Sequence, residues 1–190
     1  LEAALLLLPF CVSLIYGEKS AWAFLITIAI EAAAGVLICL VFKPKNQVIY
    51  AKEGFAIVAL TWLVLSAMGA LPFYISREIP SYIDAFFETV SGFTTTGASI
   101  IVDLEKISHG VLFWRSFTHW VGGMGVLVFI MALLSNVSDR SIHIMKAEMP
   151  GPIVGKLVPR VKDTAKILYL IYIVLTAIQV VLLMFGKMSL

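Results

Sequence analysis

Charged residues are scarce in this sequence. Only 14% of its 190 residues are Asp, Glu, Lys or Arg, whereas 61% are hydrophobic. The hydrophobic share lies far above that of ordinary soluble domains, which excludes that class and indicates an integral membrane protein. The formal net charge of +2 is too small to indicate a nucleic-acid partner.

Cysteine, histidine and catalytic motifs are also sparse. Cys11 and Cys39 lie inside apolar runs near what should be opposite membrane faces, so we do not expect them to pair. His119 is interpreted as a packing or hydrogen-bonding residue, because His109 and His143 are not at metal-ligand spacing from it. The sequence holds no H-E-x-x-H or G-x-S-x-G motif, so it predicts no enzyme and no organic cofactor.

Long apolar runs are what the chain has in abundance, and they predict an all-α membrane fold. A first, shorter helix is mildly broken by Pro9, and because it opens inside an apolar run we expect the numbered sequence to have lost its true start. Four further runs are long enough to cross a bilayer. The helices are predicted at Leu1 to Tyr16, Ala21 to Phe42, Gly54 to about Ile75, Gly110 to Leu134 and Thr164 to Phe185.

The stretch from Pro80 to Ser99 is apolar in part but too short to span. Pro80 cannot continue a helix, and Ser81 with Asp84 three residues later forms a capping pattern, so a helix should start here. Gly92 is predicted to end it after about 11 residues, or roughly 16 Å, which is about half the hydrocarbon thickness. The sequence therefore predicts a helix that enters the membrane and stops.

Three threonines, Thr94, Thr95 and Thr96, follow this helix and precede Gly97 and Ala98. Consecutive β-branched residues favour an extended backbone, whose carbonyl oxygens then lack internal partners. A ring of such carbonyls can replace the hydration shell of a monovalent cation, which is the basis of a selectivity filter. The alternative is a plain re-entrant or outer loop in which the threonines cap and turn, and the local pattern favours the two equally.

The helix predicted from Gly110 carries a second cluster. Arg115 lies about one turn in from its loop end, and we expect it either to pair with Glu88 and brace the filter or to extend its side chain to the membrane surface. Small residues there would let another backbone pack closely and support the filter. These are Gly122, Gly123 and Gly125.

Glu31 is the one acid in the middle of the second predicted helix. A carboxyl at membrane depth is costly and is a functional candidate by default. The alternative is a protonated or hydrogen-bonded packing residue between the first two helices, which we favour because no basic partner is near it in the sequence.

Basic residues are distributed unevenly between the predicted loops. If the loops after the second and fourth helices lie in the cytoplasm, nine Lys and Arg residues are inside and four are outside. The filter-like stretch then faces the outside of the cell membrane. The inner set is Lys43, Lys45, Lys52, Arg140, Lys146, Lys156, Arg160, Lys162 and Lys166, and the outer set is Lys19, Arg77, Lys106 and Lys187.

Several separate stretches resemble the Trk/Ktr/HKT superfamily of potassium transporters, most closely the bacterial Trk-type membrane subunit. They are DAFFETVSGFTTTGAS from Asp84 to Ser99, R-x-x-x-x-W-x-G-G-M-G from Arg115 to Gly125, AEMPGP from Ala147 to Pro152 and PR-x-x-x-TAK from Pro159 to Lys166. Members of that superfamily have two leading helices followed by four helix, pore loop, helix units in one chain.

The resemblance implies a potassium-channel-like arrangement for this chain. Residues 1–46 would be the two leading transmembrane helices, and residues 47–137 the first pore unit, with its filter near 94–99. Residues 138–163 would be a cytoplasmic linker, and residues 164–190 the truncated first helix of a second pore unit. Thr94 to Ala98 would supply one quarter of the filter, with potassium bound by the carbonyls of Thr95, Thr96 and Gly97.

The resemblance also implies a function and partners. The complete protein would take up potassium, as a channel or symporter, across the inner or plasma membrane, as a homodimer resting on a cytoplasmic ring of nucleotide-binding regulatory subunits. The alternatives are a non-conducting membrane subunit and a sodium-permeable member of the same superfamily. Serine at the position that matches Gly97 goes with sodium-permeable members.

Overall fold

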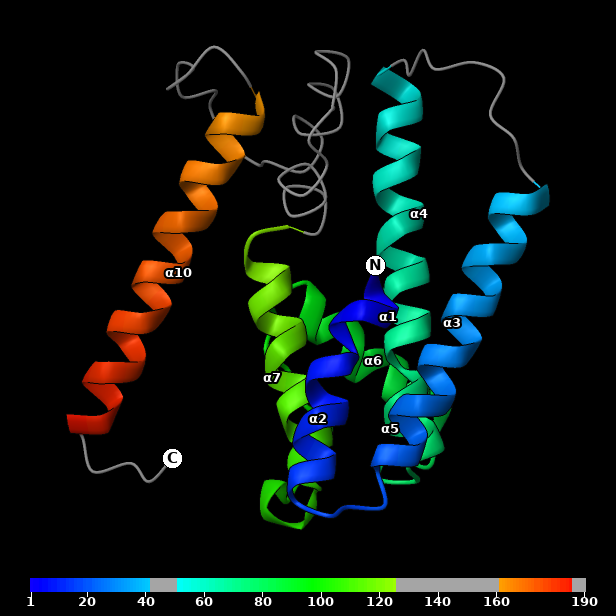
Figure 1. The fold of residues 1–190 in the computed structure, drawn as a ribbon, viewed down its shortest axis with the longest axis vertical. Helices are drawn as coiled ribbons and strands as arrows, with labels where there is room; N and C mark the ends of the chain where they lie inside the picture. The colour runs from blue at the N-terminus through cyan, green and yellow to red at the C-terminus, as the bar shows by residue number, and fades with distance from the viewer. Residues whose placement is uncertain (42–50, 126–160, 186–190) are drawn as a thin grey trace. The chain divides into compact units, whose positions relative to one another are not determined.

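The computed structural model describes the backbone of residues 1–41, 51–125 and 161–185, and side chains within these ranges except at 51–55 and 161–165. These residues form helices and turns, with no strand among them (Figure 1). They divide into two compact units, one with residues 1–41 and 59–123 and the other with residues 51–58, 124–125 and 161–185. The all-helical expectation is confirmed for the described ranges.

The described elements follow the predicted order. They are α1 (Glu2–Leu5), α2 (Leu7–Ile15), α3 (Ala21–Val41), α4 (Ala51–Gly69), α5 (Leu71–Ile75), α6 (Tyr82–Phe93), the 3-10 turn η1 (Leu104–Lys106), α7 (His109–Gly123) and α10 (Val161–Phe185).

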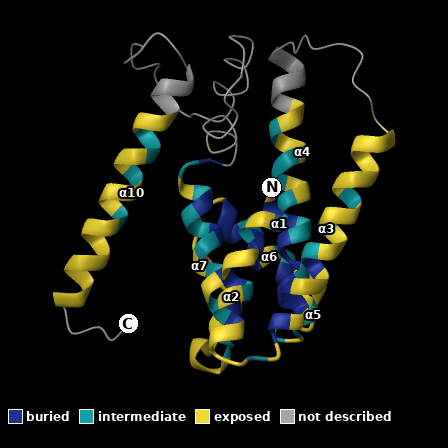
Figure 2. Cartoon of the chain, in the orientation of Figure 1, coloured by how far each residue is buried: buried dark blue, intermediate teal, exposed yellow. Residues whose placement is uncertain are grey.

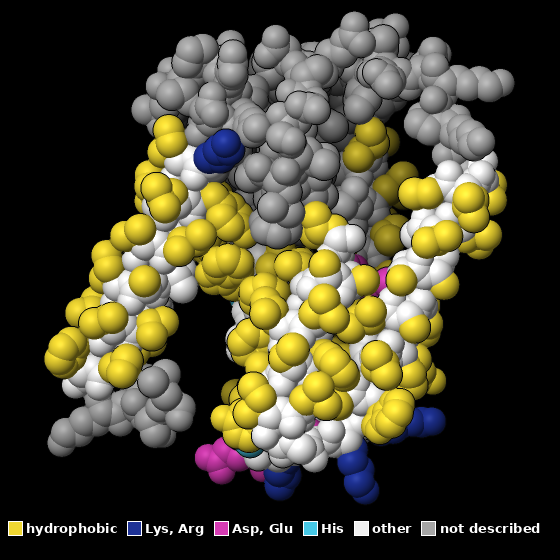
Figure 3. All heavy atoms as spheres, in the orientation of Figure 1, with side chains coloured by type: hydrophobic (Ala, Val, Ile, Leu, Met, Phe, Trp, Pro, Cys, Tyr) yellow, Lys and Arg dark blue, Asp and Glu magenta, His cyan; other side chains and the backbone are white. Residues whose placement is uncertain are grey.

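Three described segments are long and apolar enough to cross a membrane, namely Ala21–Val41, Ala56–Ile75 and Lys166–Phe185. Hydrophobic side chains cover the flanks of the first compact unit, whereas charged side chains gather at one end of it (Figure 3). On α10, large apolar residues such as Leu170, Leu182 and Phe185 are exposed. This distribution is what a bilayer requires, and the chain is an integral membrane protein.

Two predicted helices are each broken once. The first stops at Leu5 and resumes at Leu7, and the third stops at Gly69 and resumes at Leu71. Each break lies just before a proline, Pro9 or Pro72, because proline cannot donate to the carbonyl four residues earlier and its ring clashes with that carbonyl. The expectation of a single helix from Gly54 to Ile75 is therefore corrected to two helices.

Part of the predicted organisation lies outside the described residues. The helix expected from Gly110 to Leu134 is seen as α7 up to Gly123, and residues 126–134 are not described. Most of the predicted linker, 138–163, also lies outside them. The last predicted helix begins at Val161 rather than Thr164, so α10 includes the final residues assigned to that linker.

The core of the first compact unit surrounds Trp114 on α7. Its side chain is fully buried, and its indole Nε1 donates a hydrogen bond of 2.9 Å to the carbonyl of Gly69 at the end of α4. Phe93, the last residue of α6, packs edge-on against both Trp114 and Trp62. The buried residues concentrate where α5, α6 and α7 lie (Figure 2), so the short helix is held between longer ones.

At the charged end of this unit, two carboxylates fix the start of α7. Glu18 accepts hydrogen bonds from the backbone N–H groups of His109 (2.6 Å) and Gly110 (3.0 Å), and Glu78 accepts from that of Ser108 (3.0 Å). Burial raises the pKa of Glu18, but these hydrogen bonds outweigh it and leave the pKa below its ordinary value. The stabilisation by Glu18 is therefore present above the ordinary pKa of Glu and is lost as the pH falls through the lowered one.

Candidate functional site

The short helix α6 starts as the sequence predicts and ends one residue later. Ser81 is its N-cap, and the Ser81 side chain accepts a hydrogen bond of 3.4 Å from the backbone N–H of Asp84. The helix has 12 residues and runs through Gly92 to Phe93, so Gly92 does not end it. Gly92 instead provides space, because a Cβ there would lie 2.1 Å from Oγ1 of Thr118 on α7.

The segment after α6 is irregular rather than extended. Thr94 is the C-cap in the right-handed helical region, with φ −82° and ψ 0°. Thr95 and Gly97 have positive φ angles of 57° and 76°. The prediction of an extended threonine run is therefore wrong at Thr94 and Thr95, and a β-branched residue in the left-handed region is strained in a way that is common at functional sites.

The N–H groups of this segment turn back to the end of α6. Thr95 donates to the carbonyl of Gly92 at 2.9 Å, and Thr96 donates to that of Ser91 at 3.0 Å, with a longer bond from Gly97 at 3.4 Å to the same oxygen. These bonds satisfy carbonyls that the helix end would leave free. They also occupy the N–H groups of Thr95, Thr96 and Gly97, so these groups are not available to carbonyl oxygens within the segment.

The carbonyl oxygens divide into two groups. Those of Thr94 and Ala98 accept hydrogen bonds from the hydroxyls of Thr95 (2.7 Å) and Ser91 (2.6 Å). Those of Thr95, Thr96 and Gly97 accept none from the described residues, and all three residues are exposed. Ala98, predicted as a member of the ion-binding set, thus has its carbonyl occupied within this chain.

An ion pair lies directly behind this segment. Arg115 on α7 donates through Nε to Oε1 of Glu88 at 2.5 Å, and the Glu88 side chain is completely buried. Glu88 also accepts from the hydroxyl of Ser99 (2.9 Å) and the N–H of Ile100 (3.1 Å). The sequence left two alternatives for Arg115, and in the structure it pairs with Glu88 rather than extending to the membrane surface.

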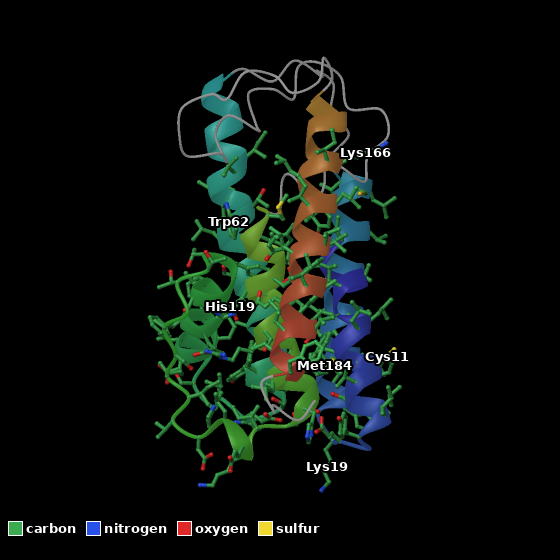
Figure 4. All side chains as sticks on the ribbon, turned by 90° about the vertical axis from the view of Figure 1, so that its left-hand side faces the viewer. Cys11, Lys19, Trp62, His119, Lys166 and Met184 are labelled. Atoms are coloured by element: carbon green, nitrogen blue, oxygen red, sulfur yellow. The ribbon has the colours of Figure 1, made fainter. Side chains whose placement is uncertain are left out.

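The predicted glycines are placed differently from one another. A Cβ on Gly122 would lie 2.2 Å from the carbonyl oxygen of Phe93, so the backbones of α6 and α7 are in contact there. Gly123 is the exposed last residue of α7, and Gly125 has a positive φ of 71° just beyond it. His119, labelled in Figure 4, bonds through Nδ1 to the carbonyl of Arg115 (2.9 Å), as expected for a packing residue.

Three hydroxyl residues around the segment were not predicted. Ser91 binds the carbonyl of Ala98, Ser99 links Glu88 to the N–H of Ile101, and Thr118 faces Gly92. Serine and threonine also form local hydrogen bonds in ordinary turns and helices, so no sequence pattern separates these three residues from the other hydroxyl residues. Their roles depend on contacts between residues far apart in the chain.

The described residues define a helical integral membrane protein in which a short helix packs against longer helices and is followed by an exposed, irregular segment. The chain belongs to the TrkH family, whose description is cation transport protein and whose model matches residues 20–188. This is a family of transporters and not of enzymes.

Individual relatives agree with this assignment. The Trk system potassium uptake proteins TrkH and TrkG of Escherichia coli K12 are 39% and 36% identical to this chain, over 97% and 86% of it. The crystal structure of the potassium transporter TrkH from Vibrio parahaemolyticus matches 98% of the chain with a TM-score of 0.78 and 33% identity. The chain spans about 38% of the TrkH relative, 34% of the TrkG relative and 37% of the crystallised chain.

Proposed function

We propose that the complete protein containing this chain takes up potassium across the cell membrane, and that Thr95 to Gly97 supply one quarter of a channel-like selectivity filter. The observation that carries this proposal is that the carbonyls of three exposed residues, Thr95, Thr96 and Gly97, accept no hydrogen bond from the described residues. Carbonyl oxygens of this kind replace water around a potassium ion. The names of the relatives supply the identity of the ion.

The surroundings of the segment support the same proposal. Its N–H groups bind α6, and the Glu88–Arg115 pair fixes the chain that leaves it at Ser99 and Ile100. A filter must hold its carbonyls in place against the pull of an ion and of water, which requires support of this type. Gly122, where α7 meets the end of α6, adds a rigid backing.

The rest of the proposal follows the family resemblance. Residues 1–46 form the two leading helices, residues 47–137 the first pore unit, residues 138–163 a cytoplasmic linker, and residues 164–190 open the second pore unit. The complete protein is a homodimer in the inner membrane, and a cytoplasmic nucleotide-binding ring regulates it. The filter faces outward.

Gly97→Ser tests the filter directly. With φ at +76° and no heavy atom within 4 Å of the added Cβ, the serine creates backbone strain without a clash. The strained residue turns its carbonyl, so we expect potassium preference over sodium to fall while expression stays near normal. The measurement is the relative flux of the two ions in vesicles that hold the complete transporter.

Gly17→Ser is the matched control, because Gly17 also has a positive φ, +65°, and open space around it, but lies in the turn after α2. It should leave selectivity unchanged. If Gly97→Ser is well expressed and as selective as the parent, Gly97 is not a filter residue. If potassium does not flow through the parent protein, the non-conducting alternative replaces the proposal.

The outward orientation predicts which loop an impermeant thiol reagent reaches. In a chain with Cys11 and Cys39 replaced, a cysteine at the fully exposed Val102 should react in intact cells, and one at Ser141 should react only after permeabilisation. Lys19 belongs to the outer set of basic residues, and it extends from the end of the first compact unit at which charged side chains gather (Figure 4). This position fits the proposed orientation. The reverse labelling pattern would place the filter on the cytoplasmic side.

A further inference from the structure

Ser91, near the end of α6, makes a hydrogen bond of a different kind from those of the threonines beside it. Thr89 and Thr94 each donate to the carbonyl four residues earlier, at 2.8 and 2.7 Å, which is the ordinary local partner of a hydroxyl on a helix. Ser91 is only 4% exposed and donates forward instead, to the carbonyl of Ala98 seven residues later, at 2.6 Å. The hydroxyl therefore joins α6 to the far end of the filter-like segment.

The backbone of Ser91 makes a separate connection to the same segment. Its carbonyl accepts from the N–H of Thr96 at 3.0 Å. The carbonyl of Gly92 accepts from the N–H of Thr95 at 2.9 Å, and Thr95 has a positive φ of 57°. This is the Schellman ending of a helix, which requires no particular side chain at position 91. The hydroxyl bond is thus the part that a substitution can remove while the helix end remains.

The Ser91 side chain acts together with that of Glu88. The two residues are three positions apart in α6 and so lie on one face of it. Ser91 binds the carbonyl of Ala98, and Glu88 binds the two residues that follow. The change from carbonyls that accept no hydrogen bond from the described residues to a chain held by α6 therefore falls directly after Gly97.

We propose that Ser91 is a specificity-determining positioning residue, whose hydroxyl ends the ion-binding run of carbonyls at Gly97 by holding the carbonyl of Ala98 toward α6. This inference rests on the proposed filter. The oxygen of Ala98 is turned toward a buried hydroxyl by a short hydrogen bond, so it does not join the carbonyls of Thr95 to Gly97 around potassium. The number of carbonyls that coordinate the ion is one of the factors that set potassium preference over sodium.

Loss of the hydroxyl should release one carbonyl. In Ser91→Ala the oxygen of Ala98 loses its donor, and it must find water or the ion as a new partner. The coordination of the ion then differs from that in the parent protein. We expect the preference for potassium over sodium to fall by about two- to tenfold, the factor that corresponds to the net strength of one hydrogen bond.

The test is the ratio of potassium to sodium flux in vesicles that hold the complete transporter. This ratio does not depend on how many molecules are folded, so a loss of folding alone does not move it. Ser91→Cys keeps nearly the same size with a weak donor and should resemble Ser91→Ala, whereas Ser91→Thr keeps the hydroxyl and should restore the preference. Ser76→Ala is the matched control, because the half-buried Ser76 also donates to a backbone carbonyl, that of Phe73 at 3.1 Å, but lies at the end of α5. It should leave the ratio unchanged.

The remaining outcomes count against the role of Ser91. If Ser91→Ala or Ser91→Cys is as selective as the parent, the hydroxyl does not limit the run of carbonyls. An equal loss in all three variants, Ser91→Thr included, would mean that packing at this position matters rather than the hydroxyl. Should Ser91→Ala fail to fold, the comparison of Ser91→Cys with Ser91→Thr decides.

Gly97→Ser distinguishes failure of this inference from failure of the filter. A flux ratio that changes in Gly97→Ser but not in Ser91→Ala contradicts only the role of Ser91. A ratio that changes in neither variant contradicts the filter itself, and the inference about Ser91 is then wrong as well.

Discussion

Gly122→Ala should prevent the first compact unit from assembling. The added Cβ would lie 2.2 Å from the carbonyl oxygen of Phe93 and 2.8 and 2.9 Å from its C and Cα atoms. All three are backbone atoms, so no side chain can rotate away, and α6 and α7 must separate. Overpacking commonly costs about 1–3 kcal/mol, and contact between two backbones should exceed that range. The measurements are the yield of folded transporter in detergent and its thermal unfolding.

Gly35→Ala is the matched control for this prediction. Gly35 lies within α3 and has no heavy atom within 4 Å of an added Cβ, so the same chemical change meets open space. It should leave yield and unfolding near those of the parent. Because Phe93 directly precedes Thr94, any Gly122→Ala protein that does fold should show reduced potassium uptake. A well-folded, fully active Gly122→Ala protein would contradict the close approach of the two helices.

The features that the sequence predicted well are the local ones. The cap at Ser81, the length of α6 and the extent of α3 each depend on a few neighbouring residues and on apolar length. The Glu88–Arg115 pair was one of two alternatives, since it joins residues 27 positions apart and only the packing of α7 against α6 decides it. Long-range contacts of this kind leave no periodic pattern in the sequence.

The predictions that the structure contradicts lie where tertiary contacts outweigh a local conformational preference. Glycine commonly ends helices, yet α6 continues through Gly92 to Phe93. The glycine at this position instead leaves space for Thr118 on α7. Thr95 is β-branched and favours an extended backbone, yet the N–H groups bound to the end of α6 hold it at positive φ. Both departures lie at the proposed filter, where local preference is most often overridden.

Removing either member of the Glu88–Arg115 pair should destabilise the protein by about 3–5 kcal/mol, because the partner then remains buried and unpaired. The side chain of Glu88 is fully buried, so it cannot recover the lost interaction by binding water, and Arg115, whose side chain is 17% exposed, can recover only part of it. Glu88→Gln should also weaken the contacts to Ser99 and Ile100, because the amide keeps only one acceptor oxygen. The measurements are chemical unfolding of the complete transporter and its potassium flux.

The double variant Glu88→Gln/Arg115→Met measures the interaction between the two side chains apart from the contribution of each one alone. If the two charges stabilise each other, the double variant should cost less than the sum of the single ones, because no charge is left unpaired. The exposed pair of Asp103 and Lys106 provides the control, since its members are 43% and 82% exposed and Lys106→Met should change stability little. Small, additive effects at Glu88 and Arg115 would show that the arginine is solvated at the membrane surface and does not brace the filter. A large coupling between them, together with lost flux in each single variant, would identify the pair as the support that holds Ser99 and Ile100 in place behind the carbonyls of Thr95 to Gly97.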